Sequence, residues 1–371
     1  MTDLLVVVGA RPNFMKAAPI VLAAERSGLS VALVHTGQHY DAGLSRVFFQ
    51  DLGLPEPGVQ LGVGSGSHAK QTARIMVAFE PELLRIDPAA VVVVGDVNST
   101  LACALVAAKE HYPVAHVEAG LRSFDERMPE EVNRRLCDHL ARYLYTTSGD
   151  ANENLRREGI PDDRVAFVGN TMIDTLVRCV DVARERRIPD RLAVGGRPYA
   201  VATLHRAENV DDPVVLSRLT AALAGVSRLL PVVLPLHPRT RRRLEGHGLR
   251  ELAKGVTITT PLGYLDFLGL VADAKLVLTD SGGLQEETTA LGVPCLTLRE
   301  STERPVTVTV GSNTVVGTDP VRIVSAAAAI LEGREPQGSV PQLWDGHAAE
   351  RIIEHLHASL PVEVELARTG S

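Results

Sequence analysis

The chain has 371 residues, a length that predicts two domains and excludes a single small module. Its composition is 45% hydrophobic and 22% charged, which is typical of a folded globular protein and not of a disordered one. The 38 Lys and Arg residues against 45 Asp and Glu residues give a formal net charge of −7. Bulk positive charge for binding a polyanion is therefore lacking, and we expect a soluble protein that binds no nucleic acid.

The four cysteines are far apart and form no Cys-x-x-Cys pair, which excludes a disulfide framework and a zinc ribbon. They are Cys103, Cys137, Cys179 and Cys295, and we expect them to be reduced and buried. The segment around the apolar run Leu4–Val8 lacks the basic region of a secretory signal and is too short to span a bilayer. We therefore expect a cytoplasmic protein with no membrane partner.

Short apolar runs recur along the chain and alternate with longer segments of helical periodicity. Their continuous Val, Ile and Leu content indicates strands that are buried on both faces, as in parallel sheets covered by helices. The runs are Leu4–Val8, Val31–His35, Val91–Val94, Val114–Val117, Val165–Val168, Tyr199–Leu204, Val232–Leu236, Val256–Thr259, Leu276–Thr279 and Pro294–Leu298. The predicted fold class is α/β, with two doubly wound domains, a boundary near Gly169 and a cleft lined by residues that follow strands.

Cations follow the first predicted strand. Gly9 allows a tight exit from the strand, and Pro12 suits the opening of a helix that we expect from about Phe14. Arg11 and Lys16 would then hold an anion near the amino terminus of that helix. An ordinary strand-to-helix turn with surface cations explains the same residues equally well. The spacing is not the Gly-x-Gly-x-x-Gly pattern of dinucleotide binding.

A glycine-containing turn is predicted between the strand Leu276–Thr279 and the helix that follows it. The backbone amides of Gly282 and Gly283, with the Ser281 hydroxyl, would bind a phosphate at the positive end of the helix dipole. Glu287 comes one and a half turns later, where its carboxylate could accept both hydroxyls of a ribose. Helix capping alone also explains Ser281 and the acidic residues after it.

Carboxylates follow two strands of the first half. Asp96 and Glu118 lie where the loops of a doubly wound sheet converge, so a solvated surface does not readily explain them. They are the main acid/base candidates. Glu130 and Glu131 open a helix after Pro129, where the helix dipole favours acids in any case, and a structural role stays open for both.

Two histidines follow strands of the second half, and each has an arginine nearby: His205 with Arg206, and His237 with Arg239. A lone histidine there is usually structural, but two at matching positions favour a polar or anionic ligand. The chain has no metal-ligand motif and no Gly-x-Ser-x-Gly or Cys/His nucleophile pattern. The residues therefore indicate a nucleotide-linked substrate and acid/base chemistry without a metal or cofactor.

A series of short motifs, some of them described above, extends in order along almost the whole chain. They are Gly9-Ala10-Arg11-Pro12 with Lys16, Thr36-Gly37-Gln38-His39, Gly95-Asp96, His116 to Arg122, Pro129 to Arg134, Gly169-Asn170-Thr171 with Asp174, His205-Arg206, Asp280 to Glu287, and Thr302-Glu303-Arg304-Pro305. This set resembles the non-hydrolysing UDP-N-acetylglucosamine 2-epimerase family. The resemblance implies a GT-B-type fold with Rossmann-like domains at residues 1–168 and 169–346, and a last helix within residues 347–371 that crosses back to the first domain. It also implies a homodimer.

The resemblance implies reversible inversion at C2 of the sugar, by anti elimination of UDP to a 2-acetamidoglucal and syn re-addition of UDP. A C2 proton without an adjacent carbonyl is weakly acidic, so the reaction needs a carboxylate base and strong stabilisation of the departing diphosphate. The implied catalytic residues are Asp96, Glu118, Glu130 and His205. The implied ligands of UDP or the sugar are Arg11, Lys16, Arg134, His205, Arg206, Tyr264, Ser281, Gly282, Gly283, Glu287 and Arg304.

The chain departs from many family members in two segments. Tyr40-Asp41 replaces Arg-Glu after His39, and Ala207 replaces a second arginine. In some relatives a second substrate molecule activates the enzyme, and the residues that could contribute to such a site here are Gln38, His39, Arg206 and His237. Four alternatives stay open: a modified UDP-sugar such as a diacetamido or 6-deoxy sugar, hydrolysis to free N-acetylmannosamine, a glycosyltransferase, and a UDP-sugar sensor.

Overall fold

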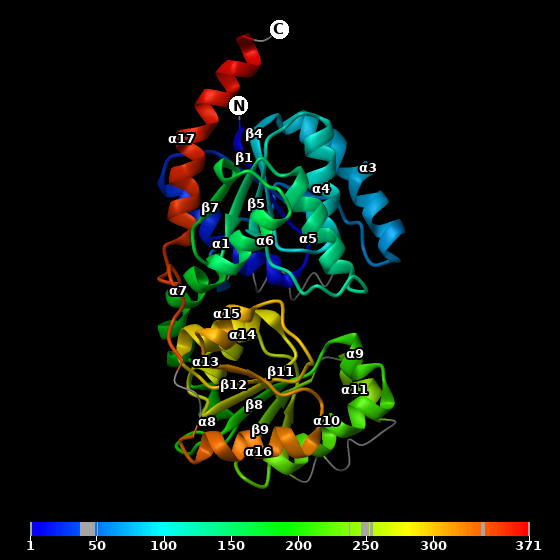
Figure 1. The fold of residues 1–371 in the computed structure, drawn as a ribbon, viewed down its shortest axis with the longest axis vertical. Coiled ribbons are helices and arrows are strands. Elements are labelled where there is room, and N and C mark those ends of the chain that lie inside the picture. The colour runs from blue at the N-terminus through cyan, green and yellow to red at the C-terminus, as the bar shows by residue number, and fades with distance from the viewer. Residues whose placement is uncertain are drawn as a thin grey trace. The chain divides into compact units, whose positions relative to one another are not determined.

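The computed structural model describes residues 2–37, 49, 51–236, 238–245, 252, 255–334 and 338–369, which divide into two units (Figure 1). Unit 1 comprises Met1–Val177 and Gln342–Ser371, and unit 2 comprises Arg178–Pro341. Within the described residues, unit 1 contains a seven-stranded sheet and unit 2 a six-stranded sheet, and all the paired strands are parallel. The predicted α/β class is confirmed.

Unit 1 has the strand order β3-β2-β1-β4-β5-β6-β7. Its strands are β1 (Thr2–Val8), β2 (Val31–His35), β3 (Val59–Gln60), β4 (Pro88–Val94), β5 (Val114–Ala119), β6 (Tyr143–Thr146) and β7 (Val165–Phe167). The chain winds outward from β1 to β3 and then returns to β4, so the strand order reverses between β1 and β4. Ligands of doubly wound sheets bind beyond the carboxyl ends of the strands at such a reversal.

Helices cover both faces of this sheet because the buried side chains alternate along each strand. Leu5 and Val7 of β1 contribute to a core under α3, α4 and α5, while α1 and α17 pack on the other face (Figure 1). The helices of unit 1 are α1 (Arg11–Arg26), α3 (His68–Ile86), α4 (Asn98–Lys109), α5 (Pro129–Leu140), α6 (Gly149–Arg157), α7 (Thr171–Glu185), which continues into unit 2, and α17 (Ala348–Thr369).

Unit 2 repeats the same plan with the strand order β10-β9-β8-β11-β12-β13 and a reversal between β8 and β11. Its strands are β8 (Ala200–Thr203), β9 (Val232–Pro235), β10 (Val256–Thr259), β11 (Leu276–Thr279), β12 (Cys295–Thr297) and β13 (Asn313–Val315). Its helices are α8 (Ile188–Arg191), α9 (Ala207–Val210), α10 (Pro213–Val226), α11 (Pro238–Glu245), α13 (Tyr264–Ala272), α14 (Gly282–Leu291), α15 (Pro305–Thr309) and α16 (Pro320–Leu331). Helices α10 and α16 cover one face of the sheet, and α8, α13 and α14 cover the other.

Two local expectations were wrong. Helix α1 begins at Arg11 and not near Phe14, because Pro12 is already in its first turn, so Lys16 lies in the second turn. Glu118 lies within β5 and not after it. Helix α17 lies within the range 347–371 and extends through Pro361 to Thr369. None of the described helices combines the length and the apolar character that crossing a bilayer requires.

A buried carboxylate caps the amino terminus of the last helix. Both oxygens of Asp174, in α7, accept backbone hydrogen bonds at the amino terminus of α17, from Ala348 N–H at 3.1 Å and from Ala349 N–H at 2.7 Å. Burial raises the pKa of Asp174 to about 6, although the two N–H bonds act to lower it. The ionised carboxylate also faces the positive end of the helix dipole. Asp174 therefore joins the two segments of chain that build unit 1.

Replacing Asp174 by Asn tests this cap. A raised native pKa means that stability from this group is full below about pH 4 and is lost as the pH rises to about 6. Over that window the free energy of unfolding of the wild type, relative to Asp174→Asn, should fall by on the order of 3 kcal/mol. Trp344, the single tryptophan of the chain, is buried in unit 1, so its fluorescence during urea unfolding gives the measurement. A difference that stays constant from pH 4 to pH 7 would contradict the assignment.

Candidate active site

Asn13 joins the ends of the two strands at the reversal in unit 1. Its side-chain oxygen accepts hydrogen bonds from Gly9 N–H at 3.2 Å and Ala10 N–H at 2.9 Å, just after β1. Its amide nitrogen donates to the Val94 carbonyl at 2.9 Å, at the end of β4. The loops after β1 and β4 are thereby held next to each other, and both contribute side chains to the candidate site.

A buried ion pair occupies this position. Lys16 of α1 and Glu118 of β5 pair directly, and both side chains are almost fully buried. Glu118 has a φ of 73°, which is unusual for a residue with a Cβ, and the pairing of β5 with β6 shifts register between Val117 and Ala119. Such a bulge redirects a side chain at a cost of about 1–3 kcal/mol in backbone strain. The irregularity of β5 therefore places the Glu118 carboxylate against Lys16.

Gly95 has no side chain, and this leaves room for the Lys16–Glu118 ion pair. A Cβ at Gly95, where φ is 69°, would lie 3.3 Å from Glu118 Oε2 and 3.3 Å from Lys16 Nζ. A side chain here would therefore disturb the ion pair as well as the turn after β4. Two carboxylates, Asp96 and Glu118, are thus brought close to the same glycine.

Asp96 is held by the amino-terminal turns of α5. Arg134 donates from Nε at 3.0 Å and from Nη2 at 2.7 Å to Asp96 Oδ2, and Asn133 donates to the Asp96 carbonyl at 2.8 Å. The Asp96 side chain keeps about a fifth of its surface exposed, whereas Arg134 is buried. Asp96 is therefore fixed in orientation and still reachable by a ligand.

The two glutamates that open α5 differ in their contacts. Glu131 is buried and accepts hydrogen bonds from Ser123 N–H at 2.9 Å, from the Ser123 hydroxyl at 3.0 Å and from Arg134 Nη1 at 2.8 Å. Glu130 is half-buried, and its carboxylate forms no ion pair with the other described residues. The structural interpretation therefore applies to Glu131, and Glu130 keeps its carboxylate available.

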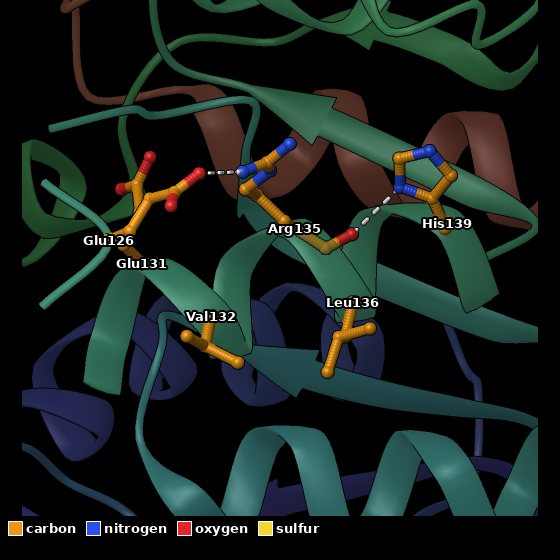
Figure 2. Close-up of a pocket in the computed structure, with 6 residues that line it drawn as sticks. All are labelled: Glu126, Glu131, Val132, Arg135, Leu136 and His139. Carbon is orange, nitrogen blue, oxygen red and sulfur yellow. Dashed lines mark hydrogen bonds and ion pairs between the residues drawn. The ribbon is translucent and has the colours of Figure 1, made fainter. Parts of the chain in front are cut away.

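A surface hollow of about 530 Å³ lies on a different face of α5 (Figure 2). It is lined by Glu126, Glu131, Val132, Arg135, Leu136 and His139. Figure 2 shows Glu126 paired with Arg135, and His139 contacting the Arg135 carbonyl. Neither Asp96 nor Glu118 lines this hollow, so it is not the site described above.

In unit 2 a fully buried aspartate organises the loop after β8. Asp280, directly after β11, accepts hydrogen bonds from His205 N–H at 3.0 Å and Arg206 N–H at 2.9 Å, and it also pairs with His205 Nδ1 at 2.8 Å. Burial alone would raise the pKa of Asp280, but these bonds outweigh it and lower the pKa. The His205 ring stays half-exposed, so it is both oriented and accessible.

Helix α14 begins directly after Asp280. Gly282 and Gly283 are its first two residues, and the Ser281 side chain before them makes no capping hydrogen bond. A Cβ at Gly282 would lie 2.7 Å from Glu303 Oε1 and 3.2 Å from Arg304 Nη1. Glycine therefore allows the charged side chains to approach this helix terminus closely.

Three arginines surround the buried Glu303. Glu303 Oε1 lies 3.1 Å from Arg206 Nη2 and 3.1 Å from Arg304 Nη1, and Glu303 Oε2 lies 2.8 Å from Arg299 Nη1. Arg304 Nε is also 3.2 Å from Glu286 Oε2, within α14. One carboxylate thus holds three guanidinium groups beside the positive end of a helix, which suits an anionic ligand.

Glu287 lies farther along α14 and is almost fully buried. Burial raises its pKa to about 7, and the nearby Glu286 adds to this, although the hydrogen bond from the Tyr264 hydroxyl, at 3.2 Å, lowers it. The raised pKa therefore brings the titration of Glu287 close to neutral pH. A ligand that donates hydrogen bonds to this carboxylate favours the ionised form.

The structure brings the predicted residues into two groups. One group lies at the strand reversal of unit 1 and comprises Lys16, Asp96, Glu118 and Arg134, with Glu130 nearby on α5. The other group lies around the strand reversal of unit 2 and comprises His205, Arg206, Ser281, Gly282, Gly283, Glu287, Tyr264 and Arg304. Gln38, His39 and His237 lie outside the described residues, as does the side chain of Arg11. Three residues that organise these groups, Asn13, Asp280 and Glu303, received no individual role in the sequence analysis. The sequence offers one sign of their importance: Asn13 and Asp280 are polar residues soon after predicted strands, and Glu303 is an acid next to an arginine. Among the residues described, no three His, Cys, Asp or Glu side chains form a cluster that could hold a metal ion.

Replacing Lys16 by Met tests the buried ion pair. The variant leaves Glu118 buried without its ammonium partner, so unit 1 should lose about 3–5 kcal/mol of unfolding free energy. The double variant Lys16→Met with Glu118→Gln should recover much of this loss. The control is Arg85→Met, which breaks the exposed Arg85–Glu82 pair on α3 and should change stability by less than about 1 kcal/mol. Urea unfolding followed by Trp344 fluorescence measures all four proteins, and equal losses in the single and double variants would refute the pairing.

Comparisons with known proteins extend over both units. A family model described as UDP-N-acetylglucosamine 2-epimerase matches residues 22–357. A UDP-N-acetylglucosamine 2-epimerase of Methanocaldococcus jannaschii is 40% identical over 361 residues, covering 95% of this chain and 98% of the relative. A UDP-2,3-diacetamido-2,3-dideoxy-D-glucuronate 2-epimerase of Pseudomonas aeruginosa is 43% identical over 357 residues, covering 95% of this chain and 99% of the relative.

A solved structure gives the same result. The crystal structure of Methanocaldococcus jannaschii UDP-GlcNAc 2-epimerase in complex with UDP-GlcNAc and UDP matches with a TM-score of 0.90 and 39% identity, covering 96% of this chain and 100% of that chain. This match confirms the predicted fold class, two Rossmann-like α/β units of the GT-B type. The chain therefore belongs to the UDP-N-acetylglucosamine 2-epimerase family.

Proposed function

We propose that the protein interconverts UDP-N-acetylglucosamine and UDP-N-acetylmannosamine by eliminating UDP and adding it back, without hydrolysing the nucleotide sugar. The observation that carries this proposal is the pair of oriented carboxylates, Asp96 and Glu118, at the strand reversal of unit 1. Each is fixed by its own cation, Arg134 or Lys16. Carboxylates that are fixed in orientation can remove and return a proton at a carbon atom.

The diphosphate is assigned to unit 2. Hydrogen-bond donors for its oxygens are the amides of Gly282 and Gly283, the Ser281 hydroxyl, and the guanidinium groups of Arg206 and Arg304. Negative charge develops on UDP as the C1–O bond breaks, and donors already in place stabilise it without reorganisation. The Glu287 carboxylate then accepts hydrogen bonds from the ribose hydroxyls. These contacts therefore favour the departure of UDP from C1, the carbon next to C2, which loses its proton.

The sugar chemistry is assigned to unit 1. In elimination, a carboxylate takes the C2 proton, the C2–H electrons form the C1–C2 double bond, and the C1–O electrons leave with UDP. In re-addition, a UDP oxygen attacks C1 and an acid returns a proton to C2 from the opposite face. Asp96 and Glu118 provide two carboxylates for the two faces, and Glu130 is a further acid/base group of unit 1. His205, which belongs to unit 2, is an additional acid/base group.

A modified sugar is the second candidate substrate. The Pseudomonas aeruginosa relative, named for a UDP-2,3-diacetamido-2,3-dideoxy-D-glucuronate, is 43% identical, compared with 40% for the Methanocaldococcus jannaschii relative. The chemistry at C1 and C2 would be the same for both sugars. The two substrates differ at C3 and C6, away from the proposed bond changes.

Deuterium exchange tests the reaction. The purified protein is incubated with UDP-N-acetylglucosamine in deuterated water, without added metal or NAD, and the sugar H1 and H2 signals are followed by NMR. We expect UDP-N-acetylmannosamine that carries deuterium at C2. Asp96→Asn and Glu118→Gln should each slow the exchange by about 10²–10⁴-fold, whereas Glu82→Gln, on the surface of α3, should not.

Other outcomes of this experiment separate the alternatives. Free N-acetylmannosamine and UDP would indicate hydrolysis instead of epimerisation. If UDP binds but no exchange occurs, UDP-N-acetylglucosamine is not the substrate, and the same incubation with the diacetamido sugar nucleotide decides between the two candidates. Absence of exchange with both sugars would refute the proposed function.

The pKa of Glu287 predicts how UDP affinity depends on pH. If ribose hydroxyls bind the ionised carboxylate, raising the pH from 6 to 8 should increase the affinity about tenfold through this group alone. The terminal phosphate of UDP also titrates, with a pKa of about 6. Isothermal titration calorimetry on the wild type and on Glu287→Gln therefore isolates the contribution of Glu287 as the difference between the two pH profiles. Parallel profiles would remove Glu287 from the ribose site.

A further inference from the structure

His116, in the middle of β5, makes two hydrogen bonds from a fully buried ring. Its Nε2 atom lies 2.8 Å from the Gly95 carbonyl, which can only accept, so Nε2 carries a proton and donates. Its Nδ1 atom lies 2.7 Å from Asp138 Oδ1, on α5. The ring therefore connects the loop after β4 to helix α5, across the strand that carries Glu118.

Asp138 extends the connection to the end of β5. It is fully buried, and its Oδ2 atom accepts a hydrogen bond from Gly120 N–H at 3.1 Å and lies 2.7 Å from Arg122 Nη2. Arg122 in turn donates to both oxygens of Glu158, at 2.8 Å and 2.7 Å. A continuous chain of charged groups thus runs from the partly exposed Glu158 to the Gly95 carbonyl.

The charges in this chain favour an ionised histidine. Arg122 and the Gly120 amide keep Asp138 ionised, so both ring nitrogens of His116 face acceptors. Burial alone would lower the pKa of His116, but the bonds to Asp138 and Gly95 outweigh it and raise the pKa. Because the ring is buried and both nitrogens are occupied, His116 is not available to a substrate.

The backbone groups that this network holds are next to the two candidate acids. Gly95 precedes Asp96, and Gly120 follows Glu118 by two residues. Gly95 and Gly120 have φ values of 69° and 78°, and Glu118 has a φ of 73°, so both turns need tertiary support. Gly95 N–H also donates to the Val117 carbonyl at 3.0 Å, which joins the two turns directly.

We propose that His116 and Asp138 are positioning residues, which hold the turns at Gly95–Asp96 and Glu118–Gly120 in the geometry that proton transfer at C2 requires. The inference rests on the proposed function, since the acids that it positions are those assigned to that reaction. Misplacement of a reacting group by about 1 Å can cost about 10²-fold in rate. The effect should therefore appear in kcat while KM and UDP affinity stay within about threefold.

Two substitutions of His116 separate its two bonds. The Gln side chain can place its amide nitrogen near the position of Nε2 and still donate to Gly95, whereas the Asn side chain reaches only the position of Nδ1. We expect His116→Asn to lower kcat about 100-fold and His116→Gln to restore at least a tenth of the wild-type kcat. A role in stability alone would not separate the two variants in this way.

A matched control removes a partly buried hydrogen bond between the neighbouring strand and helix α17, away from these turns. Tyr145→Phe, on the neighbouring strand β6, removes the contact between the Tyr145 hydroxyl and His355 Nδ1 at 3.0 Å. It should leave kcat unchanged. Trp344 fluorescence and UDP affinity verify that each variant is folded.

The outcomes are distinct. A folded His116→Asn protein whose kcat is within threefold of the wild type would overturn the inference. If His116→Asn does not fold, Glu158→Gln at the exposed end of the network decides: a three- to tenfold loss of kcat at unchanged KM supports the inference, and an unchanged kcat overturns it. Absence of C2 exchange in the wild type itself would refute the proposed function, and the inference with it.

Discussion

A fully buried aspartate that binds backbone N–H groups after a strand is the interaction on which both candidate sites depend. Asp138 in unit 1 accepts from Gly120, and Asp280 in unit 2 accepts from His205 and Arg206. Burying an ionised carboxylate is costly unless hydrogen bonds and cations compensate it. Asp138 obtains both from Arg122, His116 and Gly120, and Asp280 obtains hydrogen bonds from His205 and from the backbone N–H groups of the loop after β8. The compensation keeps each charge in place and fixes the loop that it binds.

The acids and the cations are organised differently in the two units. In unit 1 each candidate acid has its own cation, and both acids lie beside the same glycine, Gly95. In unit 2 a single buried glutamate, Glu303, holds three arginines near the start of α14. The guanidinium donors and the amides at the start of α14 suit a diphosphate. The candidate acids Asp96 and Glu118 thus lie in unit 1, and the arginines that Glu303 holds lie in unit 2.

Much of the fold could be predicted because the central strands of parallel sheets are continuous apolar runs. The strands β3, β6 and β13 were not predicted, since they are short and include polar or aromatic residues that resemble loop sequence, as in Tyr143–Thr146. The rule that ligands lie beyond the carboxyl ends of strands directed attention to Asp96, Glu118 and Ser281. The left-handed conformation of Glu118, the different environments of Glu130 and Glu131, and the arginines gathered by Glu303 depend on contacts between residues far apart in the chain, which local patterns do not encode.

The return of the last helix to unit 1 makes unit 2 an insertion within another folding unit. Residues 178–341 are continuous, so all of unit 2 has been synthesised before unit 1 receives Ile352 and Leu356 of its core. During that interval the Asp174 carboxylate has no helix to cap, and the apolar surface of α1 has no partner helix. The unit whose synthesis begins first is therefore completed last, and loss of a short carboxyl-terminal segment damages the unit that contains the amino terminus.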